Sequence, residues 1–424
     1  MLHSFAHPTE TVVPWQVLPL RIGLGATREI GHELAKLGVR RALIVTDENV
    51  ASNGVPTAIN EHAAAYGIDC VVWTGSQLEP TDTSIERGLS ELEGTSFDGY
   101  VGVGGGSCID TAKLLNLLLT HPAPLTRYVA RPHGEGAPIP GPLAPMIGVP
   151  TTAGTGSECT PMAIVDLHEN HVKAAVSHEY LRPRLAIIDP LNTVSSPPPV
   201  TAAAGYDALV QALESYTSTP YDRRPAAASP GDRPVYVGSN PLSELFCEKA
   251  IQLAGRYLRR AVFNGHDLEA REGMSQAALY SRLGNAGVHI PHANAYAVAG
   301  HVRDYEPAGY NADRPVVPHG QSVVVTAPAS FEWLYPAAPD RIDRAAELLA
   351  APRDGLAPAE VLPHWLRTLI AETGGPTSLD AFGYTRDDVP AMVETALTQQ
   401  RILVCSPREV TAEGLATVLE NSFA

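Results

Sequence analysis

Four polar residues in the second half of the sequence could together hold a divalent cation. Asp207 and Gln211 stand four positions apart in TAAAGYDALVQALE, and residues at that spacing project side by side from an α-helix. Further along, VHIPHANAYAVAG and RPVVPHGQS supply His289, His292 and His319. The four candidates for the site are Asp207, Gln211, His292 and His319, which together offer one carboxylate, one amide oxygen and two imidazoles. Imidazole nitrogens with oxygen ligands suit Fe(II), Zn(II), Co(II) or Ni(II), whereas an all-oxygen Mg²⁺ or Ca²⁺ site would not need histidine. The pattern indicates a metal site, although a solvated helix face followed by a simple PHG turn would show the same spacing.

A run of three glycines marks a second candidate site, one for phosphate. GVGGGSCIDTAK ends an apolar strand in Gly104, Gly105 and Gly106 and opens a helix at Ser107. Bare backbone amides and a helix N-terminus attract phosphate groups. Three successive glycines also sacrifice more chain entropy than a tight turn alone requires. We therefore favour pyrophosphate binding over the simpler interpretation of a turn.

Two further segments suit a nucleotide cofactor. Asp47 follows the apolar strand ALIVT, where a carboxylate can accept hydrogen bonds from both ribose hydroxyls and would repel a 2′-phosphate, so NAD is favoured over NADP. The loop VPTTAGTGSECTPMAIVD places Thr151, Thr152 and Thr155 among small residues. Hydroxyls and free amides at that density suit a polar cofactor, and a β-hairpin turn is the alternative.

A parallel sheet and a helical domain must position these residues. Between residues 19 and 189, short β-branched strands alternate with helical segments, which is typical of an α/β domain whose parallel sheet is covered on both faces. Ligands of such sheets bind at the carboxyl ends of the strands, where Asp47 and the glycine run fall. Beyond Asp189 the apolar residues recur at helical spacing, and SSPPP at 195–199 predicts the boundary between an α/β domain, 1–195, and an all-α domain, 196–424. The segment 217–240 is predicted to be one long loop.

Composition limits the range of partners. The 424 residues carry a formal net charge of -16, and the sequence has none of the Lys and Arg density that nucleic-acid surfaces need. Five scattered cysteines without a CxxC pair argue against a disulfide framework and a thiolate metal site, and fit a reducing compartment. No apolar run approaches the ~20 residues that span a bilayer, and the sequence start shows no signal-peptide pattern. We therefore expect a cytoplasmic protein with a small-molecule substrate and with no nucleic-acid or membrane partner.

The motifs GGGSCIDTAK, PTTAGTGSE, TAAAGYDALVQALESY and VVPHG, in this order, resemble the iron-containing (type III) alcohol dehydrogenase family over essentially the whole chain from Pro19 onward. Within that family, ALESYTSTPY, RPVYVGSNP, LGNAGVHIPH and YNADRPVVPHG are most similar to its transhydrogenase members. The resemblance implies an N-terminal dinucleotide-binding domain and a C-terminal helical domain in the architecture of dehydroquinate synthase. It also implies an active site in the cleft, with one divalent metal, Fe²⁺ before Zn²⁺, Co²⁺ or Ni²⁺.

The resemblance further implies roles for single residues. The family's metal ligands are an Asp and three His. They fall here on Asp207, Gln211, His292 and His319. A glutamine thus stands where the family has a histidine. Tyr296 falls where many members carry a non-ligating histidine of the proton relay, which leaves His289 as a candidate proton donor. Asp110 and Lys173 complete the expected cofactor-binding set.

These observations predict a metal-dependent, NAD(H)-linked alcohol dehydrogenase or aldehyde reductase that acts on a small anionic aldehyde or hydroxy acid, and that forms a homodimer. A second hypothesis is transhydrogenation, in which tightly held NAD carries hydride from a 4-hydroxy acid to a 2-oxo acid. A lyase like dehydroquinate synthase would share the architecture but needs a lysine-rich pocket that these motifs lack. A metal-poor, non-dehydrogenase relative is the last alternative, and Gln211 is the reason to consider it.

Overall fold

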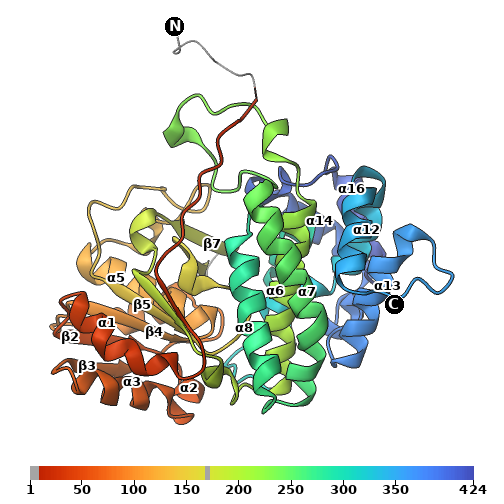
Figure 1. Cartoon of the computed structure of the whole chain (residues 1–424). Coiled ribbons are helices and arrows are strands. Elements are labelled where there is room, and N and C mark those ends of the chain that lie inside the picture. Colours follow the sequence, from red (N-terminus) through yellow and green to blue (C-terminus); the bar gives the residue numbers. More distant parts are fainter. Residues whose placement is uncertain (1–8, 168–171) are drawn as a thin grey trace, which may run out of the picture.

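The computed structural model describes residues 9–167 and 172–424 (Figure 1). The sequence predicts no signal peptide at its start. Residues 1–8 of that segment lie outside the described residues. Six parallel strands form one sheet in the order β1-β8-β5-β4-β2-β3, and two more strands form an antiparallel hairpin, β6-β7. The strands are β1 (Leu20–Ile22), β2 (Arg41–Val45), β3 (Asp69–Trp73), β4 (Gly99–Gly104), β5 (Met146–Pro150), β6 (Met162–Leu167), β7 (Val172–Ser177) and β8 (Leu185–Ile188).

Both faces of the sheet are buried, as the unbroken apolar strands predict. Successive side chains of a strand point to opposite faces, and in β2 Leu43 belongs to one core cluster while Ile44 belongs to another. The cluster around Ile44 is closed by α1 and α3, and the cluster around Leu43 by α4, α5 and the β6-β7 hairpin. The helices of this half are α1 (Ile30–Lys36), α2 (Glu48–Ser52), α3 (Val55–Ala64), α4 (Asp82–Glu91) and α5 (Gly106–Thr120).

The C-terminal half is helical and packs beside the sheet domain (Figure 1). Its long central helix is buried over almost its whole length against the helices that follow it. The helices are α6 (Pro198–Thr217), α7 (Pro241–Phe263), α8 (Leu268–Leu283), α9 (Ile290–Gly300), α10 (His319–Val324), α11 (Ala327–Leu334), α12 (Pro339–Leu348), α13 (Pro358–Glu372), α14 (Val389–Leu397), α15 (Gln400–Leu403) and α16 (Ala412–Glu420). Among the described helices, none combines the length and apolar character needed to cross a bilayer.

The predicted fold class is confirmed, with corrections in detail. Helix α5 begins at Gly106 rather than Ser107. The threonine-rich loop is not a hairpin turn, because β5 belongs to the large sheet while β6 pairs with β7. The segment 217–240 is not wholly irregular, since it contains two short 3₁₀ helices, Tyr221–Arg223 and Pro230–Asp232. The boundary at residue 195 stays a prediction; α6 begins three residues beyond it, at Pro198.

Candidate active site

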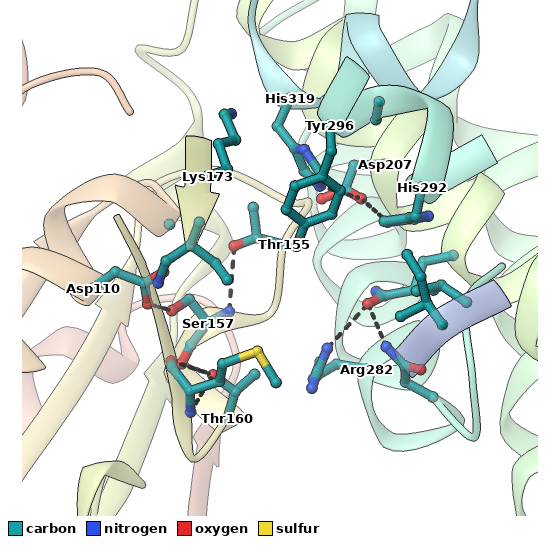
Figure 2. Close-up of a pocket in the computed structure, with 18 of the residues that line it drawn as sticks. Asp110, Thr155, Ser157, Thr160, Lys173, Asp207, Arg282, His292, Tyr296 and His319 are labelled. Atoms are coloured by element: carbon teal, nitrogen blue, oxygen red, sulfur yellow. Dashed lines mark hydrogen bonds and ion pairs between the residues drawn. The ribbon is translucent and has the colours of Figure 1, made fainter. Parts of the chain in front are cut away.

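Three of the four predicted metal-site residues meet at one point between the two halves (Figure 2). Asp207 lies on α6, His292 on α9 and His319 at the first residue of α10. One candidate ligand atom from each lies within 4.8 Å of the other two. His292 Nε2 is 3.4 Å and His319 Nε2 3.8 Å from Asp207 Oδ1. Two imidazoles and a carboxylate with room for further oxygen ligands make a donor set that fits an open catalytic site for Fe²⁺ or Zn²⁺.

A carboxylate that the sequence analysis missed holds His292 in place. Glu214 is fully buried on α6, accepts hydrogen bonds from the backbone amides of His289 and His292, and contacts Nδ1 of His292. A carboxylate on one ring nitrogen leaves the other nitrogen free to ligate a metal. Glu214 stands seven residues after Asp207, so helical spacing does put both on one face. That spacing is the signal that would have found it.

The electrostatics around His292 favour a cation. Burial lowers the pKa of His292, but Glu214 and Asp207 outweigh burial and raise the pKa to about 10. Burial alone would raise the pKa of Glu214; contact with His292 and the backbone amides instead holds it below its ordinary value. In the metal-free protein this imidazole is therefore protonated at neutral pH, and a metal must displace that proton.

The close packing of α10 on α6 places His319. A Cβ atom at Gly320 would lie 1.7 Å from the carbonyl oxygen of Ala203, far inside any van der Waals contact. Only glycine lets the two helices approach so closely. The PHG segment is therefore a packing device that carries His319 to Asp207, and the structure distinguishes it from a simple turn.

Gln211, the fourth predicted ligand, lines the same cavity but is engaged elsewhere. Its side-chain oxygen accepts hydrogen bonds from Arg282 Nη1 at 3.1 Å and Asn285 Nδ2 at 2.7 Å, and its nitrogen donates to Ser281 Oγ at 3.1 Å. Both lone pairs of the amide oxygen thus have donors. Ligation of a metal by Gln211 stays a prediction, and in this arrangement it would require the loss of one of those contacts.

His289 does not occupy the position predicted for it. It precedes α9 as its N-cap residue, with φ −145° and ψ −108°, instead of lying one helical turn before His292. It is fully buried, its Nε2 lies 3.2 Å from Thr217 Oγ1, and burial lowers its pKa to about 4. It is not among the described residues that line the cavity. A proton-transfer role for His289 stays a prediction without a contact to support it.

The cavity that contains the ligand cluster has a volume of about 150 Å³ and lies between the domains. Tyr296, which we predicted to be catalytic, lines it, and its hydroxyl accepts a hydrogen bond from Arg401 Nη2 at 2.6 Å. Lys173 also lines it, paired with Glu79 at 2.5 Å. Figure 2 shows Lys173 on the sheet side of the cavity, across from the ligand cluster.

A larger cavity, of about 660 Å³, adjoins the first, and Ser107 lines both. Its walls are the carboxyl ends of β2, β4 and β5, as expected for a parallel sheet. The predicted cofactor residues in its wall are Asp47, Gly105, Ser107, Thr151 and Thr152.

The glycine turn leaves one backbone position open to the larger cavity. Gly104 has φ +144°, and a Cβ there would lie 2.5 Å from Cys108 Sγ. A Cβ at Gly106 would lie 2.7 Å from Thr155 Oγ1, whereas one at Gly105 would meet nothing closer than 3.5 Å. Gly104 and Gly106 are thus needed for packing, and Gly105 leaves the backbone open to the cavity at the N-terminus of α5. This arrangement fits a pyrophosphate.

The remaining predicted cofactor residues lie on the other side of Ser107. Asp110, Thr155 and Lys173 line the smaller cavity. Asp110 receives hydrogen bonds from Lys113 at 3.1 Å, from the amide of Ile164 at 3.0 Å and from the Ser157 hydroxyl. Its carboxylate is thus committed to holding the loop after β5. Cofactor contacts by these three residues stay predictions, and their position favours the nicotinamide or substrate end.

Comparison with known proteins agrees with this fold and site. A family model for iron-containing alcohol dehydrogenases matches residues 19–190, and one for the C-terminal part of the same family matches residues 235–423. Hydroxyacid-oxoacid transhydrogenase of Xenopus tropicalis is 40% identical over 98% of this chain and 91% of its own, and that of Homo sapiens is 38% identical over 98% and 90%. Among solved structures, a 1,3-propanediol oxidoreductase and an alcohol dehydrogenase from Oenococcus oeni each superpose with a TM-score of 0.82 at 28% identity, over 97% of this chain and 100% of theirs.

The chain therefore belongs to the iron-containing alcohol dehydrogenase family, and it is an oxidoreductase acting on CH–OH groups. The predictions of NAD and a divalent metal as its cofactors are confirmed at the level of this family. The expectation of a cytoplasmic protein is contradicted, because the transhydrogenases at 40% and 38% identity are named as mitochondrial. That expectation rested on the cysteine usage and on the absence of a secretory signal-peptide pattern, and neither of these distinguishes the cytoplasm from a mitochondrion.

Proposed function

We propose that the chain transfers hydride reversibly between NAD(H) and the carbinol carbon of a small hydroxy acid. One observation carries the proposal: the Asp207, His292 and His319 cluster faces a small cavity that meets a nucleotide-sized cavity at Ser107. A nicotinamide placed at that junction would lie beside a substrate bound near the cluster. When bound there, a divalent metal supplies Lewis-acid polarisation of the substrate oxygen.

Different residues of the chain support cofactor binding and proton transfer. Gly105 and the N-terminus of α5 suit the pyrophosphate, and the Asp47 carboxylate suits an unphosphorylated ribose. Oxidation of the alcohol releases one hydride to the nicotinamide and one proton. The Tyr296 hydroxyl lines the cavity and accepts a hydrogen bond from Arg401. We assign the transfer of this proton to that hydroxyl.

The test combines metal analysis with a substrate screen. The purified protein, loaded with Fe²⁺ or Co²⁺, is assayed for NADH oxidation with 4-oxobutanoate and with neutral aldehydes, beside Asp207→Asn as a metal-site variant. We expect activity in the native protein only. Equal activity in the metal-free protein and in Asp207→Asn would overturn the proposal.

Transhydrogenation is a second candidate, favoured by the name shared by the relatives at 38–40% identity. In that reaction bound NAD accepts hydride from one hydroxy acid and delivers it to an oxo acid without leaving. The discriminating measurement supplies 4-hydroxybutanoate and a 2-oxo acid without free NAD. Formation of both products at many turnovers per enzyme supports transhydrogenation, and dependence on added NAD contradicts it.

The predicted homodimer stays a prediction.

A further inference from the structure

The wall of the small cavity contains a guanidinium group that forms no ion pair with any carboxylate of the described residues. Arg282, on α8, points into this cavity from the helical side (Figure 2). Its Nη1 donates to Gln211, and in the described part of the chain its Nε and Nη2 have no hydrogen-bond or ion-pair partner. Other arginines of the described chain do form ion pairs. Arg314, which pairs with Asp166 at 2.9 Å, is an example. The edge of the guanidinium formed by Nε and Nη2 is therefore available to a ligand.

Two acids, Asp207 and Glu158, interact electrostatically with Arg282. The carboxylate of Asp207 belongs to the metal cluster, with Oδ1 facing His292 and His319. Glu158 is 4% exposed, and burial raises its pKa despite the charges of Lys113 and Arg282. Among the described residues, neither acid forms an ion pair with Arg282, so the guanidinium stays available to an anionic group.

The side chain of Arg282 is held in a fixed orientation. Gln211 Oε1 binds both Arg282 Nη1 and Asn285 Nδ2, and Gln211 Nε2 binds Ser281 Oγ. The aliphatic part of Arg282 covers Gly156, where an added Cβ would lie 2.6 Å from its Cβ and Cγ. Gly156 also has φ +64°, so glycine is required there on two counts. A preorganised guanidinium loses less entropy when it binds an anion.

We propose that Arg282 binds the carboxylate of the substrate and that Gln211 positions the side chain of Arg282. We call this carboxylate-binding site the seat. The seat and the metal cluster line the same cavity, with the apolar side chains of Met162, Ile164 and Val288 also in its wall. A short hydroxy or oxo acid would place its carboxylate on Arg282, its methylene groups on this apolar lining and its reacting oxygen at the metal ligands. An imidazole at position 211 could not accept two N–H donors through one oxygen. The glutamine thus serves substrate recognition, and this inference rests on the proposed function.

The test compares a charged and a neutral form of one substrate, 4-oxobutanoate and its methyl ester, with the metal-loaded protein and NADH. Arg282→Met should lower the ratio of kcat/KM for acid over ester by about 100-fold, since charge-assisted bidentate contacts discriminate at that scale. The loss should appear mainly in KM for the acid, because the seat binds ground and transition states alike. Arg344→Met, which removes an exposed arginine of α12, should leave the ratio unchanged.

Two further variants separate charge, geometry and fold. Arg282→Lys keeps the charge without the fork, and an intermediate ratio is expected. Gln211→Met removes the positioning oxygen and should lower the ratio by about 10-fold while bound metal stays stoichiometric. Loss of metal in Gln211→Met would place Gln211 at the ion and overturn its positioning role. An unchanged ratio in a folded Arg282→Met, or an effect confined to the Kd for NADH, would overturn the carboxylate seat. Activity with the ester in the native protein reports on the proposed function independently.

Discussion

His292 lies between two carboxylates of the same helix: its Nδ1 contacts Glu214, and its Nε2 is 3.4 Å from Oδ1 of Asp207. The two acids stand at positions i and i+7 of α6, so one helix supplies both a metal ligand and the group that orients a second ligand. This relationship makes the metal site depend on a residue that would not itself touch the metal.

Replacing Glu214 by glutamine should weaken metal binding by about 10- to 100-fold. The glutamine oxygen can still accept the backbone amides of His289 and His292, so the fold should survive. Its amide nitrogen, however, would donate to Nδ1 of His292 and move the ring proton to Nε2, where the metal should bind. Competition against a chelator measures the change. Glu248→Gln on α7, a partly exposed acid paired with Arg344, is the control. Unchanged affinity would show that Glu214 does not set the tautomer.

Metal affinity should rise with pH. The pKa of His292 in the metal-free protein is raised to about 10, so at neutral pH metal binding must release a proton. The apparent affinity should therefore increase by up to ~10-fold per pH unit between pH 6 and 8. By the same linkage, His292 stabilises the metal-free fold fully below its ordinary pKa of 6.5, and this contribution is lost as the pH rises through about 10. A chelator titration at several pH values tests the slope, and a flat profile would contradict it.

Gly320→Ala should strip the metal as well as destabilise the fold. The new methyl group would meet the carbonyl oxygen of Ala203 at 1.7 Å, so α10 must move away from α6 and take His319 with it. A cost of about 1–3 kcal/mol or more in the free energy of unfolding is expected from such overpacking. Denaturant unfolding and metal content are measured together. The control is Gly231→Ala, in the short 3₁₀ helix Pro230–Asp232, where an added Cβ would meet nothing closer than 3.8 Å. A normal metal content would mean that the close packing at Gly320 does not position His319.

Asp47→Ser should relax the preference for NADH over NADPH. In the structure Asp47 also caps α2 by accepting a hydrogen bond from the Val50 amide at 2.8 Å. Serine keeps a capping oxygen while it removes the charge that would repel a 2′-phosphate. The ratio of kcat/KM for the two cofactors is the measurement, and Glu61→Gln controls for loss of a distant charge. A native preference for NADPH would refute the assignment.

His292→Asn and His289→Asn should separate a ligand from its neighbour. The first should remove metal and activity together. The second exchanges a buried ring that contacts Thr217 Oγ1 and packs at 6.4 Å from the ring of Phe331, so we expect lower stability with metal retained. Metal analysis after gel filtration decides between them. The reverse result would place the ligand at His289.

Local sequence determined much of this protein. The period of the apolar residues fixed an α/β half and a helical half, because burial on two sheet faces or one helix face dictates that spacing. The glycine turn, Asp47, Asp207 and the PHG histidine were visible because each depends on its own element. The hydrogen bonds that engage Gln211, the position of His289 and the contacts that Glu214 and Arg282 make were visible only in the tertiary structure. Each depends on which side chain of another helix lies opposite, and that pairing is set by how α6, α8 and α9 pack, which no single stretch of sequence contains.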